Sequence, residues 1–198
     1  MAGGAIPVSS IGMARYVMNV FILNAGRCGS TTFIKACQHI TNYTALHESR
    51  SGLSGDQRLA YPPRHIEADN RLSWLLGRLD RQFGNHAFYV RLSRNRRSSV
   101  ESFVQRSEYG IMKAYRDGIL LGGKGQTTAE LAADYLDTVE SNISLFLKDK
   151  TNKMEFRMES AMHDFPRFWS AIDAEGDLEK AIAEWQIRYN ASNKNTLL

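Results

Sequence analysis

Apolar positions along the chain follow two periods, one typical of strands and one typical of helices. The run 16–23 is apolar on both faces, which is typical of a strand buried on both sides of a parallel sheet. Further strands are predicted at 43–46, 64–68, 86–92 and, near a sheet edge, 153–158. Helical spacing of apolar residues predicts helices at 33–40, 72–83, 98–115, 131–147, 165–172 and 178–189. Strands that alternate with helices predict an α/β domain with a largely parallel sheet.

Local signals predict where some of the helices begin and end. Ser98 with Glu101, and Thr127 with Glu130, have the form of a capping box at a helix start. Asp69 or Asn70 can cap the helix over 72–83. The segment 118–125 holds four glycines and is predicted to be a mobile connection.

A glycine-bearing turn joins the first predicted strand to the first predicted helix. The turn reads Gly26-Arg27-Cys28-Gly29-Ser30-Thr31-Thr32. A helix N-terminus offers unpaired N–H groups and partial positive charge, and glycines let the backbone approach an anion closely. Arg27 adds a cation that can bind two oxygens of one anion, and three hydroxyl residues follow. The pattern predicts a phosphate- or sulfate-binding loop, and the alternative is an ordinary strand-to-helix turn.

The loop differs from the triphosphate-binding loop of kinases and GTPases. That loop needs the pattern G-x-x-x-x-G-K-[ST], whereas no lysine follows Gly29 here and Gly26 lies only three residues before it. The strand before the arginine cluster ends in Arg91-Leu92-Ser93, without an acidic residue that could hold magnesium. An ATP- and magnesium-dependent enzyme is therefore disfavoured, and no metal is expected.

Composition and charge narrow the class of protein. The chain has 198 residues, of which 43% are apolar, and we expect one domain over 1–198, with a loosely ordered N-terminus over 1–14 and a polar tail over 190–198. The net charge of +4 is mild, but four arginines fall within seven residues: Arg91, Arg94, Arg96 and Arg97. Such a cluster fits a small polyanion better than a nucleic acid, which usually meets a longer basic face. The alternative is a solvated basic surface.

Cysteine use and hydropathy predict a cytoplasmic protein without a membrane span. Cys28 and Cys37 cannot form a multi-bridge framework, so a reduced setting is the simpler assumption. The apolar run 17–23 is too short to cross a bilayer. The sequence leaves the oligomeric state open.

The glycine loop resembles the 5′-phosphosulfate-binding loop of sulfotransferases, which use 3′-phosphoadenosine 5′-phosphosulfate (PAPS) as donor. Arg27-Cys28-Gly29-Ser30-Thr31 is similar to the Arg-Ser-Gly-Ser-Thr of bacterial and carbohydrate-acting members, with the weaker donor Cys28 in place of serine. The resemblance covers 17–106 and implies a three-layer α/β/α fold of the P-loop type. It implies transfer of a sulfuryl group from PAPS to a hydroxyl of a small molecule or glycan. A P-loop kinase and a catalytically inactive nucleotide-binding protein are the alternatives.

A second motif of the family binds the 3′-phosphate with an arginine at a strand end and a serine eight residues later. Arg94 and Ser102 have this spacing. Arginines at a helix N-terminus oppose the helix dipole, and a bound phosphate would turn that conflict into a favourable arrangement. The resemblance therefore implies a donor site made of the residues 26–32 together with Arg94 and Ser102, and the alternative for the arginines is a solvated turn.

Sulfuryl transfer also needs stabilisation of growing charge and a base that accepts the acceptor's proton. By resemblance, Arg27 is the residue that stabilises charge. Groups at the carboxyl ends of parallel strands converge on one crevice, and the second predicted strand runs into His47 and Glu48. We expect Glu48 to be the base, with His47 as the second candidate and His65 and Glu67 as remoter ones. The structural alternative is an ion pair of Glu48 with Arg50 or another arginine. The acceptor pocket is expected from 49–63 and 105–125.

Overall fold

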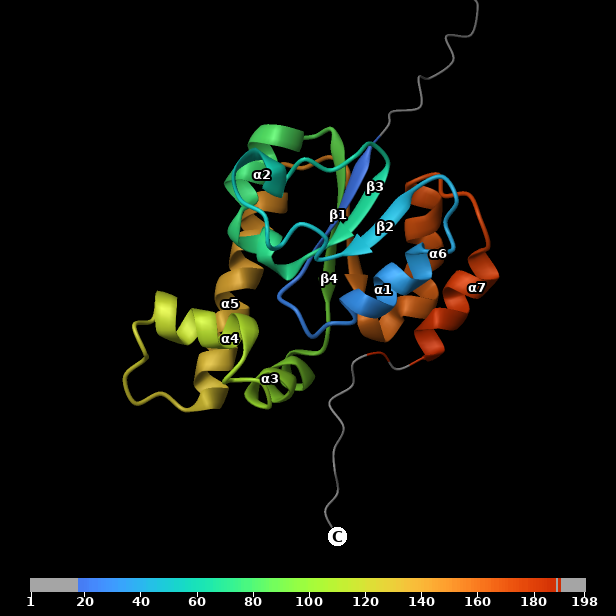
Figure 1. The fold of residues 1–198 in the computed structure, drawn as a ribbon. Coiled ribbons are helices and arrows are strands. Elements are labelled where there is room, and N and C mark those ends of the chain that lie inside the picture. The colour runs from blue at the N-terminus through green and yellow to red at the C-terminus, as the bar shows by residue number, and fades with distance from the viewer. Residues whose placement is uncertain (1–17, 188, 190–198) are drawn as a thin grey trace, which may run out of the picture.

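The five predicted strands form one parallel sheet in the computed structural model, which describes residues 18–187 and 189 (Figure 1). The segments 1–14 and 190–198, and residues 16 and 17 of the first predicted strand, lie outside the described residues. The order across the sheet is β2-β3-β1-β4-β5. The strands are β1 (Asn19–Leu23), β2 (Thr44–His47), β3 (His65–Ala68), β4 (Ala87–Ser93) and β5 (Lys153–Arg157). The predicted edge position of β5 is confirmed.

Helices cover both faces of the sheet, which confirms the three-layer α/β/α prediction. In Figure 1, α1, α6 and α7 lie on one side of the strands, and α2, α3 and α5 lie on the other. Two separate apolar clusters fill the space between the layers. The helices are α1 (Ser30–Cys37), α2 (Leu76–Phe83), α3 (Arg96–Val104), α4 (Gly110–Ala114), α5 (Thr128–Leu147), α6 (Ala161–Ala171) and α7 (Leu178–Ala183).

Strand β1 is buried on both sides, as its continuous apolar run predicts. Val20 and Ile22 point into the cluster under α1 and α6, whereas Phe21 and Leu23 point into the cluster under α2 and α5. The four side chains are 0% exposed. Because β1 pairs in parallel with both β3 and β4, the loops that follow these three strands emerge at the same edge of the sheet.

The start of α3 corrects the capping prediction at Ser98. The helix begins at Arg96, because the Asn95 side chain accepts a hydrogen bond from the Ser98 backbone N–H at 3.1 Å. Glu101 instead contacts Arg97 one turn earlier on the exposed face. At α5 the capping box of Thr127 and Glu130 is confirmed, with both reciprocal bonds present.

Three predicted helices are shorter or interrupted in the structure. The helix predicted over 98–115 is interrupted, because a turn over 105–109 separates α3 from α4, which begins at Gly110 with a φ of 52°. A π-helical turn, Tyr115–Ile119, follows α4. The prediction over 72–83 splits into a 3₁₀ helix, Asn70–Trp74, which Asp69 caps, and α2. The last prediction, 178–189, ends as α7 and a 3₁₀ turn, Glu184–Gln186.

Candidate active site

The glycine loop lies between the end of β1 and the start of α1, as the sequence predicts. Gly26, Arg27 and Gly29 have φ angles of 94°, 59° and 90°, in the left-handed region that glycine adopts at little cost. Gly29 is the N-cap of α1 and makes no side-chain cap bond. A turn of this kind before a helix N-terminus is the backbone form in which N–H groups gather around an anion.

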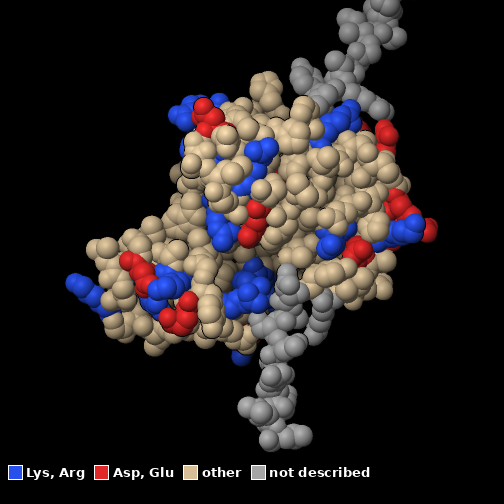
Figure 2. Space-filling view, in the orientation of Figure 1, with Lys and Arg blue, Asp and Glu red and all other residues tan. Residues whose placement is uncertain are grey.

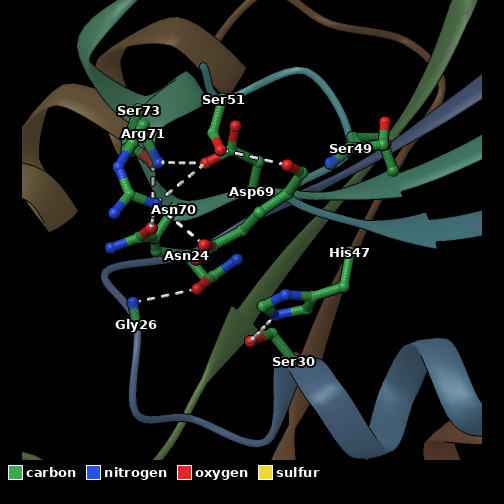
Figure 3. Close-up of polar contacts among 12 residues, drawn as sticks. Asn24, Gly26, Ser30, His47, Ser49, Ser51, Asp69, Asn70, Arg71 and Ser73 are labelled. Carbon is green, nitrogen blue, oxygen red and sulfur yellow. Dashed lines mark hydrogen bonds and ion pairs between the residues drawn. The ribbon is translucent and has the colours of Figure 1, made fainter.

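Neighbouring elements hold the first half of the loop in place. The Asn24 side chain accepts a hydrogen bond from the Gly26 N–H at 2.9 Å, as Figure 3 shows, and the Tyr135 hydroxyl donates to the Ala25 carbonyl at 2.6 Å. A Cβ atom at Gly26 would lie 3.1 Å from the Asn70 amide and 3.5 Å from the Phe103 ring. The loop is therefore packed between the 3₁₀ helix after β3 and helix α3, and there is little room for it to move.

Arg27, Arg94 and Ser102 lie together in the structure, although they are far apart in the sequence. The Arg27 Nε–H donates to the Ser102 Oγ at 3.0 Å, and the Arg94 Nη1–H donates to the Arg27 carbonyl at 3.2 Å. The pKa of Arg27 is lowered by burial and then by the positive charges of Arg106 and Arg94. Both halves of the predicted anion site thus meet at Arg27, and Arg106 is a neighbour that the sequence analysis missed.

The other three arginines of the cluster have acidic partners. Their ion pairs join Arg91 to Glu140 and Glu155, Arg96 to Asp137, and Arg97 to Glu101. The pair of Arg96 is bidentate, with Nη–Oδ distances of 2.5 and 2.9 Å. Of the four arginines, Arg94 is the one with a recorded contact to the glycine loop. The surface interpretation therefore applies to Arg91, Arg96 and Arg97, and anion binding by Arg94 stays a prediction.

Cys28 sits in the loop with a buried side chain that is 4% exposed. Burial raises the pKa of its thiol to about 12, so the group is neutral near pH 7. The thiol is therefore neither a nucleophile nor a charged ligand in this structure. A small pocket behind the loop brings Cys28 close to Asn24, Arg94 and Ser99.

The carboxyl end of β2 faces the start of α1. The His47 Nε2 lies 3.0 Å from the Ser30 Oγ, as Figure 3 shows, which links two residues that the sequence analysis assigned to different roles. Glu48 is the next residue after His47, and its φ of 51° lies in the left-handed region of backbone conformation. Its N–H donates to the Ala68 carbonyl at 3.0 Å. The turn after β2 is thereby held against β3, next to the glycine loop.

Glu48 has an arginine partner, as the structural alternative predicted, but the partner is Arg71. The Arg71 Nη1 and Glu48 Oε2 atoms are 3.0 Å apart, and the Glu48 side chain is 35% exposed. The backbone N–H of Arg71 donates to the Asp69 Oδ1 at 2.8 Å. Asp69 is fully buried and pairs with Arg58 at 2.5 Å. Burial raises the pKa of Asp69, while the Arg71 N–H and Arg58 act in the opposite direction.

The remoter candidates His65 and Glu67 are buried and support the turn after β2. They are 1% and 0% exposed. The Glu67 carboxylate accepts bonds from the Ser49 N–H at 2.7 Å and the Ser49 hydroxyl at 2.6 Å, and it lies 2.9 Å from the His65 Nε2. These contacts position the residue next to Glu48 and leave neither side chain accessible to an acceptor.

Basic side chains gather at one place on the face that carries the loop. Lysine and arginine side chains gather between α3 and the loop after β1 (Figure 2). Among the described residues, no helix is long and apolar enough to cross a bilayer.

Comparison with solved structures identifies the fold. The sulfotransferase domain from the curacin biosynthetic pathway aligns with a TM-score of 0.63 at 16% identity, over 88% of this chain and 80% of that domain. The fold is that of a sulfotransferase. Mouse sulfotransferase SULT7A1, complexed with PAP, aligns with a TM-score of 0.54 at 12% identity, over 85% of this chain and 64% of that protein. No protein-family model and no curated protein matches the sequence.

The P-loop-type three-layer fold that the resemblance to sulfotransferases implies is confirmed. At these identities the likeness is one of fold. The chemistry of the site is therefore argued below from the contacts of its own residues.

Proposed function

We propose that the chain transfers a sulfuryl group from PAPS to a hydroxyl of a small molecule or glycan. The sulfotransferase fold supports the proposal. The observation that carries it is the meeting of Arg94 and Ser102 with the glycine loop at Arg27. PAPS carries anionic groups at the 5′ and 3′ positions of its ribose, and this site offers a helix N-terminus for one of them and an arginine–serine pair for the other.

The donor is held by two parts of the chain. The backbone N–H groups of Gly26–Thr32, at the N-terminus of α1, bind the 5′-phosphosulfate, with help from the Ser30, Thr31 and Thr32 hydroxyls. Arg94 and Ser102 bind the 3′-phosphate. The left-handed Gly26 and Gly29 support this fit, because they let the backbone approach the anion closely.

Two residues of the site, Arg27 and Glu48, have separate roles in the transfer step. The acceptor oxygen forms a bond to sulfur while the bond between sulfur and the bridging phosphate oxygen breaks, and adenosine 3′,5′-bisphosphate (PAP) leaves. Arg27 stabilises the negative charge that grows on the transferring group. Glu48 accepts the proton of the acceptor hydroxyl, and Arg71 holds its carboxylate in position. His47 is the second candidate for the base, through its contact with Ser30.

The test is transfer of radioactive sulfate from ³⁵S-labelled PAPS to components of a cell extract. Wild type is expected to label a product. Glu48→Gln is expected to bind PAP as well as wild type does and to lose activity by about 10²-fold or more. The matched control is Glu179→Gln, an exposed glutamate on α7, which keeps wild-type activity.

Two outcomes would count against the proposal. Labelling from γ-³²P-labelled ATP with magnesium, and none from PAPS, would make the chain a kinase. Tight binding of PAP without transfer to any component of several extracts would make it an inactive nucleotide-binding protein.

A further inference from the structure

Arg106 lies where the end of α3 meets the glycine loop. It follows Ser102 by four residues, about one helical turn, and Ser102 accepts the hydrogen bond of Arg27. The chain turns back directly after α3, with the Arg106 N–H donating to the Phe103 carbonyl at 2.9 Å. Arg106 is exposed, so its guanidinium can meet a molecule that enters from solvent.

Two further arginines contribute positive charge near Arg27. Arg106 and Arg94 both lower the pKa of Arg27, in that order, after burial. In the part of the chain that the structure describes, no carboxylate is recorded within ion-pair distance of the Arg94 or Arg106 side chains. The arginines Arg91, Arg96 and Arg97 do have such partners. An arginine without a recorded acidic partner is expected to attract anions from solution.

Arg94 precedes α3 and Arg106 follows it, so the two residues flank opposite ends of the helix. The helix has nine residues, which corresponds to a length of about 13 Å. At the Arg106 end, Phe103 packs beside Gly26, and Asn70 packs beside the same glycine. The next residue after Asn70 is Arg71, the partner of Glu48. Arg106 therefore borders the side of the loop where Glu48 lies, whereas Arg94 precedes the helix.

We propose that Arg106 binds an anionic group of the acceptor, so that the acceptor is an acidic hydroxyl compound. A guanidinium can hold a carboxylate, a phosphate or a sulfate ester through two parallel hydrogen bonds. Bound in this way, the acceptor is held by its anionic group at Arg106 while its hydroxyl faces Glu48, on the same side of the loop. The same positive charges disfavour an amine acceptor. This inference rests on the proposed function, since it assumes that the donor occupies the loop.

The test measures the binding of small probes to protein saturated with PAP. The probes form two pairs that differ in charge: glucuronate with glucose, and 4-hydroxybenzoate with 4-hydroxybenzamide. Affinities are measured by NMR titration for wild type, for Arg106→Gln and for Arg97→Gln. Arg97 is the matched control, because it lies on the same helix, is exposed and has Glu101 as its partner.

In at least one pair, wild type is expected to bind the anion about tenfold or more tightly than its neutral counterpart. Arg106→Gln is expected to abolish this preference and to keep the affinity for PAP within twofold of wild type, and Arg97→Gln is expected to change neither. The inference is overturned if wild type shows no preference for the anion in either pair, or if Arg106→Gln keeps the preference. It is also overturned if Arg106→Gln weakens PAP binding fivefold or more, because Arg106 would then bind the donor. Failure of wild type to bind PAP would instead refute the proposed function.

Discussion

The buried ion pair between Arg58 and Asp69 offers the sharpest test of how the fold supports the site. The two side chains are 5% and 0% exposed, and their Nη2 and Oδ2 atoms are 2.5 Å apart. Asp69 follows β3 directly and also caps the 3₁₀ helix that carries Arg71. Removal of its carboxylate by Asp69→Ala leaves the Arg58 guanidinium buried, with only the Tyr61 hydroxyl as a recorded side-chain partner.

The expected loss in the free energy of unfolding is large because the charge of Arg58 stays buried and is not solvated by water. Breaking a buried pair by removing one partner costs about 3–5 kcal/mol. In a chain of 198 residues this corresponds to a fall in Tm of about 6–20 °C. The matched control is Glu101→Ala, which removes the exposed partner of Arg97 and should cost no more than about 0.5 kcal/mol.

The assay is urea unfolding of the two variants, with the free energy of unfolding compared with that of wild type. A third variant, Arg58→Met with Asp69→Leu, replaces both charges by apolar groups and is expected to recover most of the loss. The reasoning is refuted if Asp69→Ala and Glu101→Ala differ by less than about 1 kcal/mol. It is also refuted if the double replacement is no more stable than Asp69→Ala.

Two further predictions concern the glycine loop. Gly29→Ala should lower the free energy of unfolding by about 1–2 kcal/mol, because its φ is 90°. Gly77→Ala in α2 has open space around its Cβ, should be neutral or stabilising by up to about 1 kcal/mol, and serves as control in the same urea titration. Iodoacetamide at pH 8 should label Cys28 about 10³-fold more slowly than an ordinary thiol, since burial raises its pKa from 9.0 to about 12. Labelling within minutes, without unfolding, would contradict this.

The sequence predicted the glycine loop because all of its signals are local. The apolar run of β1, the glycines and the helical face of α1 are contiguous, so the loop could be placed between them without knowledge of the fold. The spacing of Arg94 and Ser102 likewise indicated two residues that the structure brings to Arg27. The order of the strands was not predicted, because it depends on pairing between distant segments.

The features that the sequence analysis missed depend on contacts in the folded structure, which no local pattern in the sequence reveals. Arg58 lies in the segment 49–63, which was expected to contribute to the acceptor pocket, yet its side chain is buried, with 4% exposed, and pairs with Asp69. Arg96 looks like a site residue until Asp137, 41 residues later, is seen to hold it. The sequence analysis placed the cap of α3 at Ser98. Asparagine and serine are both good N-cap residues, so the residue type alone does not decide between Asn95 and Ser98, and only the backbone geometry selects Asn95.

The measurement that tests the central claim most directly is calorimetric titration of the protein with PAP and with adenosine 5′-monophosphate. A site with separate 5′ and 3′ parts predicts that PAP binds at least tenfold more tightly, because only PAP reaches Arg94. Arg94→Ala should remove that advantage, whereas Arg97→Ala should keep it. Equal affinities of the two nucleotides for wild type, or a PAP preference that survives Arg94→Ala, would contradict the two-part donor site.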